Sequence, residues 1–202
     1  MPEPGFGEPD GAKVIGQWGD VRIEVAPHDA VTVGAALAIV GVFTREAAGN
    51  GPGGGLKHLD TALNGALLRL RSDGIFGAAP GELLTLTAVS PPIQAHDVIA
   101  VGLGDPDAFT PAGLRLAVSA AAQEAIRLAA PSAAFAPSLL DSGIDRTLLP
   151  GAESAMLGGL IDALATRSHD VALSCWIFCA GAEHLDAVAA AFRDALLTLD
   201  RR

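Results

Sequence analysis

An unbroken apolar run from Ala35 to Phe43 is the feature that most restricts how this chain can fold. Gly34 and the polar Thr44 mark its two ends. A strand with one wet face alternates apolar and polar residues, whereas a strand covered on both faces is apolar throughout. A glycine-rich loop at residues 49–55 and a segment with leucines at helical spacing follow the run. This order predicts a buried strand, a loop and a helix, which is the unit of layered α/β folds.

Strand and helix patterns continue to alternate along the chain. Val21 to Ala26 alternates apolar and polar side chains, which is typical of a half-buried strand. Thr110 and Pro111 predict the cap and first residue of a helix that runs to about Ala129. We expect further strands over residues 81–89, 98–103, 132–140 and 171–179, and further helices over residues 56–72, 149–167 and 183–199. The alternation predicts an α/β domain with helices packed on a mostly parallel or mixed sheet.

Length and composition indicate one domain with a short tail. The chain has 202 residues, which suits one generous domain better than two. Residues 1–11 are rich in Pro, Gly and Glu and lack the basic and apolar regions of a signal peptide, so we expect a flexible tail. We assign residues 12–202 to a single domain. No apolar stretch reaches the ~18 to 20 residues of a membrane span, and we therefore expect a soluble, cytoplasmic protein.

The charge of the chain argues against two classes of partner. Its formal net charge is −10, and no run of basic residues occurs. Nucleic-acid binding depends on Lys and Arg side chains that neutralise phosphates. Anionic lipid surfaces likewise attract clusters of basic residues. We therefore expect neither a nucleic acid nor a membrane as partner.

Several motifs, in the same order, give the chain a family resemblance. Ile39–Phe43 is similar to the VVGVFE strand of the N-terminal domain of leucyl (cytosol) aminopeptidases, and Leu59–Leu67 is similar to its LDxALGGAL helix. Gly77–Leu86 is similar to its GKxGETLLL turn and strand. Val98–Gly104 is similar to its VLLVGLG strand, and Leu114–Arg115 to the helix after it. Four motifs in register over about eighty residues carry the resemblance, which weakens after about residue 130.

The resemblance implies a fold and argues against one activity. It implies a macrodomain-like fold of three layers, with a mixed, mostly parallel sheet between helices, and residues 170–202 look like an added strand and helix. In the full-length relatives, peptidase activity belongs to a separate C-terminal domain that binds two metal ions through a Lys and several carboxylates. No segment of this chain matches the NTDAEGR motif of that domain. We therefore expect no aminopeptidase activity, no catalytic residue, no metal and no cofactor.

Two glycine-rich loops are the candidate ligand site. Free N–H groups in such a loop, together with the first turn of the helix after it, favour anions. The first loop is not a Walker A loop, because Leu56 separates Gly55 from Lys57. It is similar to the loop that binds ADP-ribose in macrodomains, and a loop after the strand over residues 98–103 would form the other side of the crevice. The alternative is that these glycines only serve tight turns. The candidate ligand-binding residues are Asn50, Gly53, Gly54, Gly55, Gly102 and Gly104.

The cysteines and histidines give weaker signals. Cys175 and Cys179 lie four apart on an expected strand, about 13 Å from each other, which excludes a disulfide between them and suggests buried thiols. His58 and Asp60 are the only pair near metal-ligand spacing, and residues two apart on a helix diverge. We expect surface or capping roles for the histidines and a core role for Trp176, although tryptophan can also anchor an interface. The histidines are His28, His58, His96, His169 and His184.

Two functions of different classes follow. The first is a non-catalytic, stand-alone relative of the aminopeptidase N-terminal domain that acts as an interaction or structural module. On this reading we expect a homo-oligomer or another protein as partner. The second is macrodomain-like binding, or hydrolysis, of an ADP-ribose-type nucleotide, with that small molecule as ligand. Calorimetry with ADP-ribose separates the two.

Overall fold

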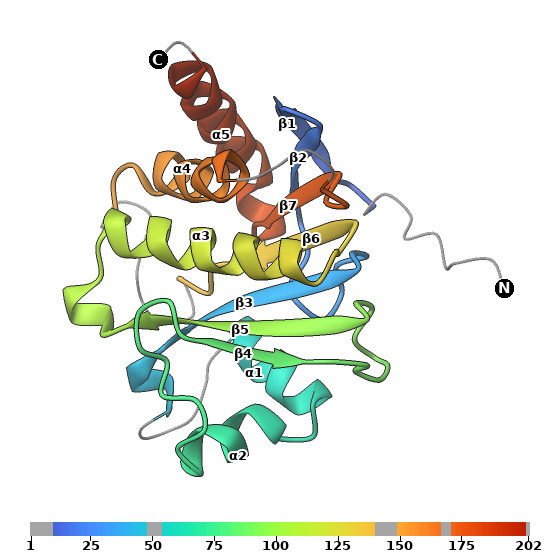
Figure 1. Ribbon diagram of the computed structural model, residues 1–202, viewed down its shortest axis with the longest axis vertical. Coiled ribbons are helices and arrows are strands. Elements are labelled where there is room, and N and C mark those ends of the chain that lie inside the picture. Colours follow the sequence, from blue (N-terminus) through green and yellow to red (C-terminus); the bar gives the residue numbers. More distant parts are fainter. Residues whose placement is uncertain (1–9, 48–53, 140–148, 167–170, 201–202) are drawn as a thin grey trace, which may run out of the picture.

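One seven-stranded sheet forms the centre of the molecule, in the strand order β1-β2-β7-β6-β3-β5-β4 (Figure 1). The computed structural model describes residues 10–47, 54–139, 149–166 and 171–200. The expected tail lies mostly outside these ranges. The strands are β1 (Lys13–Trp18), β2 (Val21–Ala26), β3 (Leu37–Phe43), β4 (Leu83–Leu86), β5 (Asp97–Gly104), β6 (Ser132–Ala136) and β7 (Cys175–Cys179).

The interior of the sheet is parallel and its two edges are antiparallel. Strands β2, β7, β6, β3 and β5 run in one direction, while β1 pairs antiparallel with β2 and β4 pairs antiparallel with β5. Every residue of β3 is buried, as its unbroken apolar sequence predicts. These pairings confirm the predicted mixed, mostly parallel sheet, and they bring the carboxyl ends of β2, β3, β6 and β7 to one edge.

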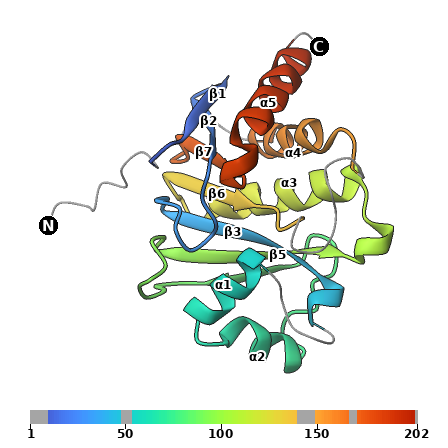
Figure 2. The same cartoon turned by 180° about the vertical axis from the view of Figure 1, so that it is seen from behind.

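Helices cover both faces of the sheet, which gives three layers. Figure 1 shows α3 in front of the sheet, and the view from behind in Figure 2 shows α1 in front. Side chains of α3, α4 and α5 belong to one apolar cluster, and those of α1 and α2 to the other. The α-helices are α1 (Gly54–Ala62), α2 (Ala66–Ser72), α3 (Pro111–Arg127), α4 (Ala152–Ala165) and α5 (Leu185–Leu199). The described residues also include the short 3₁₀ helices η1 (Thr44–Ala47), η2 (Pro106–Ala108) and η5 (Ala182–His184).

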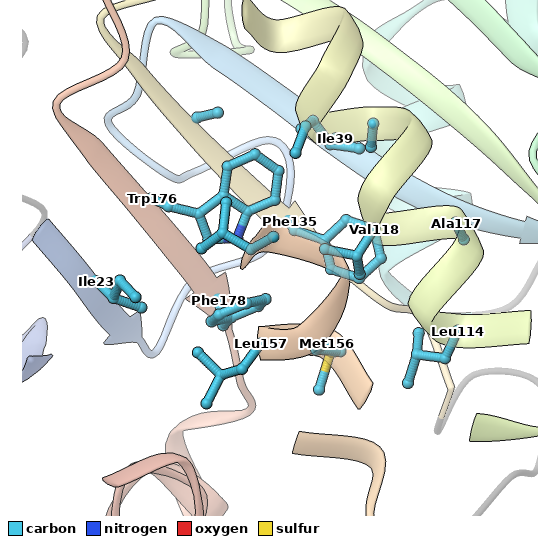
Figure 3. Packing of buried hydrophobic residues seen from close by; sticks show 14 of the residues in the cluster. Ile23, Ile39, Leu114, Ala117, Val118, Phe135, Met156, Leu157, Trp176 and Phe178 are labelled. Carbon is cyan, nitrogen blue, oxygen red and sulfur yellow. The ribbon is translucent and has the colours of Figure 1, made fainter. Parts of the chain in front are cut away.

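Aromatic side chains fill the larger cluster. Trp176 and Phe135 are fully buried, and Figure 3 shows them beside side chains of α3 and α4. Phe178 stacks on Phe192 of α5, with ring centroids 4.4 Å apart. Trp176 therefore has the core role that its sequence context favours.

The predicted helix over residues 56–72 is wrong as one element. The structure has two helices, because Asn64 and Gly65 take left-handed backbone angles with φ of 54° and 74°. The buried Asp60 carboxylate accepts a hydrogen bond from the Leu68 N–H at 3.1 Å, in the second helix. Leucine spacing alone continues through such a turn, so the pattern could not show the break. By contrast, the Thr110 cap is confirmed, since its hydroxyl accepts from Gly113 N at 3.2 Å.

The end of the chain forms a central part of the sheet. Strand β7 is shorter than the expected strand over residues 171–179, and it lies between β2 and β6. Its first residue, Cys175, pairs with Arg22 of β2 on one side and with Ser132 of β6 on the other. A strand in this position completes the parallel interior of the sheet. The segment after residue 170 is thus integral to the fold, although the family resemblance does not extend to it.

Helices α3 and α4 pack closely. Gly159 of α4 lies against the backbone of α3 at Arg115 and Ser119, where an added Cβ would overlap main-chain atoms. One turn along, Arg115 and Asp162 form a paired ion bridge with N···O distances of 2.6 and 2.7 Å. In the part of the chain that the structure describes, no helix is long and apolar enough to cross a membrane.

Candidate functional site

A cavity of about 430 Å³ opens at the edge where the parallel strands end. Its walls come from the segments that follow β2, β6 and β7 and from the first turns of α1 and α4. Open α/β sheets bind ligands at this edge, outside the carboxyl ends of the strands. The volume falls within the range of about 300 to 1,000 Å³ that is typical of small-molecule sites.

Much of the cavity wall is apolar. Val40 of β3, Met156 of α4 and Phe178 of β7 line it, together with Val188 and Phe192 of α5. Phe178 and Phe192 are the stacked pair of the core, so this wall is held by tight packing. A rigid apolar surface of this kind suits the faces of a sugar or an aromatic ring.

Asp29 is a polar side chain of the cavity wall that accepts several hydrogen bonds. Its Oδ1 accepts hydrogen bonds from Val31 N at 3.0 Å, from Thr32 N at 2.9 Å and from the Thr32 hydroxyl at 2.8 Å. Its Oδ2 accepts from His58 Nδ1 at 2.6 Å. Burial would raise the pKa of Asp29, but the hydrogen bonds from His58 and Thr32 outweigh burial and lower this pKa. Asp29 is therefore a carboxylate at neutral pH.

The bond between Asp29 and His58 joins two walls of the cavity. His58 belongs to α1, and Gly55 in the first turn of that helix lines the cavity. Asp29 belongs to the segment between β2 and β3. His58 lies at the surface, as expected for the histidines, and its partner is a carboxylate from a distant segment of the chain. Asp60 is not its partner, since the carboxylate of Asp60 bonds the backbone of α2.

The other described histidines have local partners or line the rim. His28 and His184 line the cavity, and His28 Nε2 donates to the Asp10 carbonyl at 2.8 Å. His96 Nδ1 lies 2.8 Å from Asp97 Oδ1. His169 lies outside the described residues. Within the described ranges, no three His, Cys, Asp or Glu side chains converge as metal ligands would.

The first turns of two helices face the cavity. Gly55 of α1 lines it, as do Ala152 and Glu153 of α4. No side chain caps the N-terminus of α4, where Gly151 has φ of 84°. The first N–H groups of a helix lack acceptors within the helix and attract anions. Anion binding at this edge is chemically possible through main-chain groups.

The structure separates the predicted glycines into two groups. Gly54 begins α1 with φ of 44° and Gly55 lines the cavity, whereas Asn50 and Gly53 lie outside the described residues. Gly102 and Gly104 lie away from the cavity wall, against the segment of residues 78–80. A role of these glycines in binding stays a prediction.

Close packing accounts for the two glycines of β5. An added Cβ on Gly102 would overlap the Ala79 carbonyl, and one on Gly104 would lie 2.8 Å from the Pro80 ring. Gly104 also has φ of 79°, a conformation that L side chains rarely adopt. Close approach of the backbone, and at Gly104 the left-handed φ, give a structural reason for glycine at these two positions.

The two cysteines are buried free thiols on one face of β7. Burial, more than any neighbouring charge, raises the pKa of Cys175 to about 11. Burial and the nearby Asp29 carboxylate raise the pKa of Cys179 to about 12. Cys179 lines the cavity, but its thiol stays protonated at neutral pH and is a poor nucleophile.

Comparison with protein families identifies the fold family. Residues 39–159 match the model of the cytosol aminopeptidase family, N-terminal domain. The chain belongs to this family. None of the curated protein sequences matches it. The match begins within β3 and ends within α4, so β1 and β2 at one end and β7 and α5 at the other lie outside it.

Solved structures show the same fold at low sequence identity. A mutant of tomato leucine aminopeptidase aligns with a TM-score of 0.67 and 19% identity, over 87% of this chain and 35% of the enzyme. The aminopeptidase-family chain thus spans about a third of that enzyme's length. A Trypanosoma brucei macrodomain in complex with ADP-ribose aligns with a TM-score of 0.67 and 16% identity, over 94% and 78% of the two chains. An Oceanobacillus iheyensis macrodomain mutant aligns with a TM-score of 0.66 and 14% identity, over 93% and 98%. These alignments confirm the predicted macrodomain-like fold.

Proposed function

We propose that this domain is a non-catalytic binding module whose ligand is an ADP-ribose-type nucleotide. The observation that carries the proposal is the cavity at the carboxyl edge of the sheet, which combines an apolar wall with the first turns of α1 and α4. Of the two functions that the sequence suggests, the geometry supports this one better.

The shape and chemistry of the cavity suit both parts of such a ligand. The wall of Val40, Met156 and Phe178 offers apolar contact to a base or ribose. The first turns of the two helices offer main-chain N–H groups to a pyrophosphate. A ligand of this class is long enough to need both kinds of surface.

Structural neighbours support the same ligand class by analogy of fold. The Trypanosoma brucei macrodomain is known with ADP-ribose and with ADP. Fold alone does not determine function, so the residues of the site have to carry the assignment. In this chain those residues are Gly55, Asp29 and the apolar wall.

The module is proposed to bind without hydrolysing peptides. The resemblance implies that peptidase chemistry belongs to a different domain of the family, and two-metal hydrolysis requires carboxylates that converge on the metal ions. A role in protein interaction, which includes self-association, stays the competing hypothesis. It predicts that the cavity binds no nucleotide.

Isothermal titration calorimetry with ADP-ribose tests the proposal. Gly181 lies at the cavity wall with φ of −61°, which any residue can adopt, and an added Cβ would meet only the His184 ring edge at 4.0 Å. Gly181→Phe should therefore fold and reduce affinity at least about tenfold by occupying the rim. Ala190→Phe adds a similar side chain on the exposed face of α5 and should bind normally. Absence of heat with the wild-type protein contradicts the proposal and favours the interaction hypothesis.

A further inference from the structure

The two outermost strands of the sheet, β1 and β4, differ in how their free sides are protected (Figure 1). In β1, the strand register shifts between Val14 and Gly16, and the Arg193 guanidinium donates to the Val14 carbonyl at 3.1 Å. An ion pair between Lys13 and Asp186 lies beside the same strand. Bulges and charged side chains of this kind prevent other strands from pairing with an edge strand.

Strand β4 has neither a bulge nor a charged side chain over Leu83–Leu86. All four of its residues are half-buried, so each is partly open to solvent. Leu83 packs against the apolar cluster that includes α3, while Leu84 and Leu86 pack against the cluster that includes α1. Leucine side chains therefore border the free side of β4 on both faces of the sheet. An edge strand of this kind is a template for pairing with another strand.

The backbone groups of Leu83 and Thr85 point away from the sheet. Residues of an antiparallel pair alternate between those that bond the neighbouring strand and those that face outward. The Glu82 carbonyl accepts from Gly102 N of β5 at 2.8 Å, so the even-numbered residues of β4 bond β5. The N–H and C=O groups of Leu83 and Thr85 consequently face outward. No hydrogen-bond partner for these outward groups is found among the residues that the structure describes.

We propose that β4 pairs antiparallel with β4 of a second copy of this chain, about a two-fold axis at Thr85. In such a contact the same residues of both copies meet. Outward groups of the two Thr85 residues bond each other, and Leu84 of each copy faces Leu86 of the other. Cross-strand pairs of threonine with threonine and of apolar side chains stabilise a sheet. An axis at Leu84 would instead place Leu86 against Glu82 of the other copy.

Charges beside Thr85 favour a second copy as the partner. The Thr85 hydroxyl donates to Glu124 Oε1 at 3.2 Å. Glu124 also accepts from Nε and Nη2 of Arg127, both at 2.7 Å, and the Arg127 side chain is 66% exposed. An axis at Thr85 brings two such pairs together, so the guanidinium of each copy can face the carboxylate of the other. The copies thus have complementary charges at this contact, although each has a formal net charge of −10.

The inference is independent of the proposed function, because no residue of β4 lines the cavity. Pairing of the two β4 strands should therefore leave nucleotide binding unchanged. A contact between two short strands is smaller than a standard interface, which buries about 1,200 to 2,000 Å². We accordingly expect a weak, reversible dimer.

Sedimentation velocity of the full chain without nucleotide, over a concentration range of about 5 to 500 µM, tests the proposal. The wild-type protein should change from monomer to dimer within this range. Thr85→Pro removes the outward N–H at the axis but no bond to β5, and should raise the dissociation constant of the dimer at least about tenfold. Gln17→Pro is the matched control on β1. The N–H of Arg22, opposite Gln17, bonds Ser174, so Gln17 also faces outward, and this variant should dimerise like the wild type.

Hydrogen exchange provides a second measurement, which needs no variant. The amides of Leu83 and Thr85 should exchange more slowly at the highest protein concentration than at the lowest. The amide of Leu84, which bonds β5, should be protected at both concentrations. A wild-type protein that stays monomeric throughout overturns the proposal and leaves this strand to a different partner. A folded Thr85→Pro variant that dimerises as tightly as the wild type also overturns it, since the contact then lies elsewhere.

Discussion

Asp29 and His58 are 29 residues apart in the sequence, yet Oδ2 of one lies 2.6 Å from Nδ1 of the other. The carboxylate also accepts bonds from the backbone of its own turn. One side chain thus shapes the segment between β2 and β3 and ties it to α1. Two walls of the cavity depend on this contact.

Two replacements of Asp29 should separate its hydrogen bonds to its own turn from the charge that it presents to His58. Asp29→Ala loses the bonds to Val31 N, Thr32 N and His58, and we expect the free energy of unfolding to fall by about 1 to 2 kcal/mol at pH 7. Asp29→Asn keeps an acceptor for the turn but loses the charge that faces His58. Its free energy of unfolding should therefore fall by less than that of Asp29→Ala. Chemical denaturation of both variants beside the wild type measures the difference.

The contribution of Asp29 to the stability of the folded protein should decrease as the pH falls. Because its pKa is lower in the folded protein than in the unfolded chain, its charge contributes stability above about pH 4, and this contribution is lost as the pH falls through the folded value. The stability gap between wild type and Asp29→Asn should therefore shrink in acid. A gap that widens as the pH drops below 4 contradicts the assignment.

A methyl group at Gly159 should destabilise the contact between α3 and α4. The added Cβ would overlap the Arg115 carbonyl and the backbone of Ser119, which cannot move aside like a flexible side chain. We expect Gly159→Ala to cost about 1 to 3 kcal/mol, even though alanine favours helices. Gly113→Ala is the matched control, since its Cβ would lie 3.4 Å from the Phe109 ring, an ordinary contact. Thermal melts that show equal stability for the two variants rule out this explanation of Gly159.

The sequence predicts the layers of this fold better than its site. Buried strands such as β3 are visible because both faces are apolar, and the Thr110 cap is visible because capping is local. The pairing of Asp29 with His58 joins distant segments, and no spacing rule reports it. The glycine spacing at Gly102 and Gly104 predicts a loop that faces a ligand, whereas in the structure their backbone approaches another segment. Short-range patterns reveal elements, whereas tertiary contacts decide which loops meet.

The two cysteines should be unreactive in the folded protein. With pKa values of about 11 and 12, the thiolate fractions of Cys175 and Cys179 at pH 8 fall at least about 100-fold below that of a thiol with the ordinary value of 9.0. Both side chains are also buried. Labelling of the two cysteines with a chromogenic disulfide should therefore be slow in buffer and fast in 6 M guanidinium chloride. In the denaturant, each chain should release two molecules of the reagent's coloured thiol. Equally fast labelling in both conditions would show that β7 is open to solvent.

Peptide hydrolysis provides the sharpest test of the non-catalytic proposal. Two-metal catalysis needs carboxylates that hold both ions, and within the described residues no group of three potential ligands converges. The purified chain should therefore leave leucine p-nitroanilide intact when manganese or zinc is added, while a full-length leucine aminopeptidase serves as the positive control. Metal-dependent turnover that persists through further purification contradicts the proposal, because it requires a metal centre. A melting temperature that does not change with either metal gives independent support, since an ion bound only by the folded state would raise it.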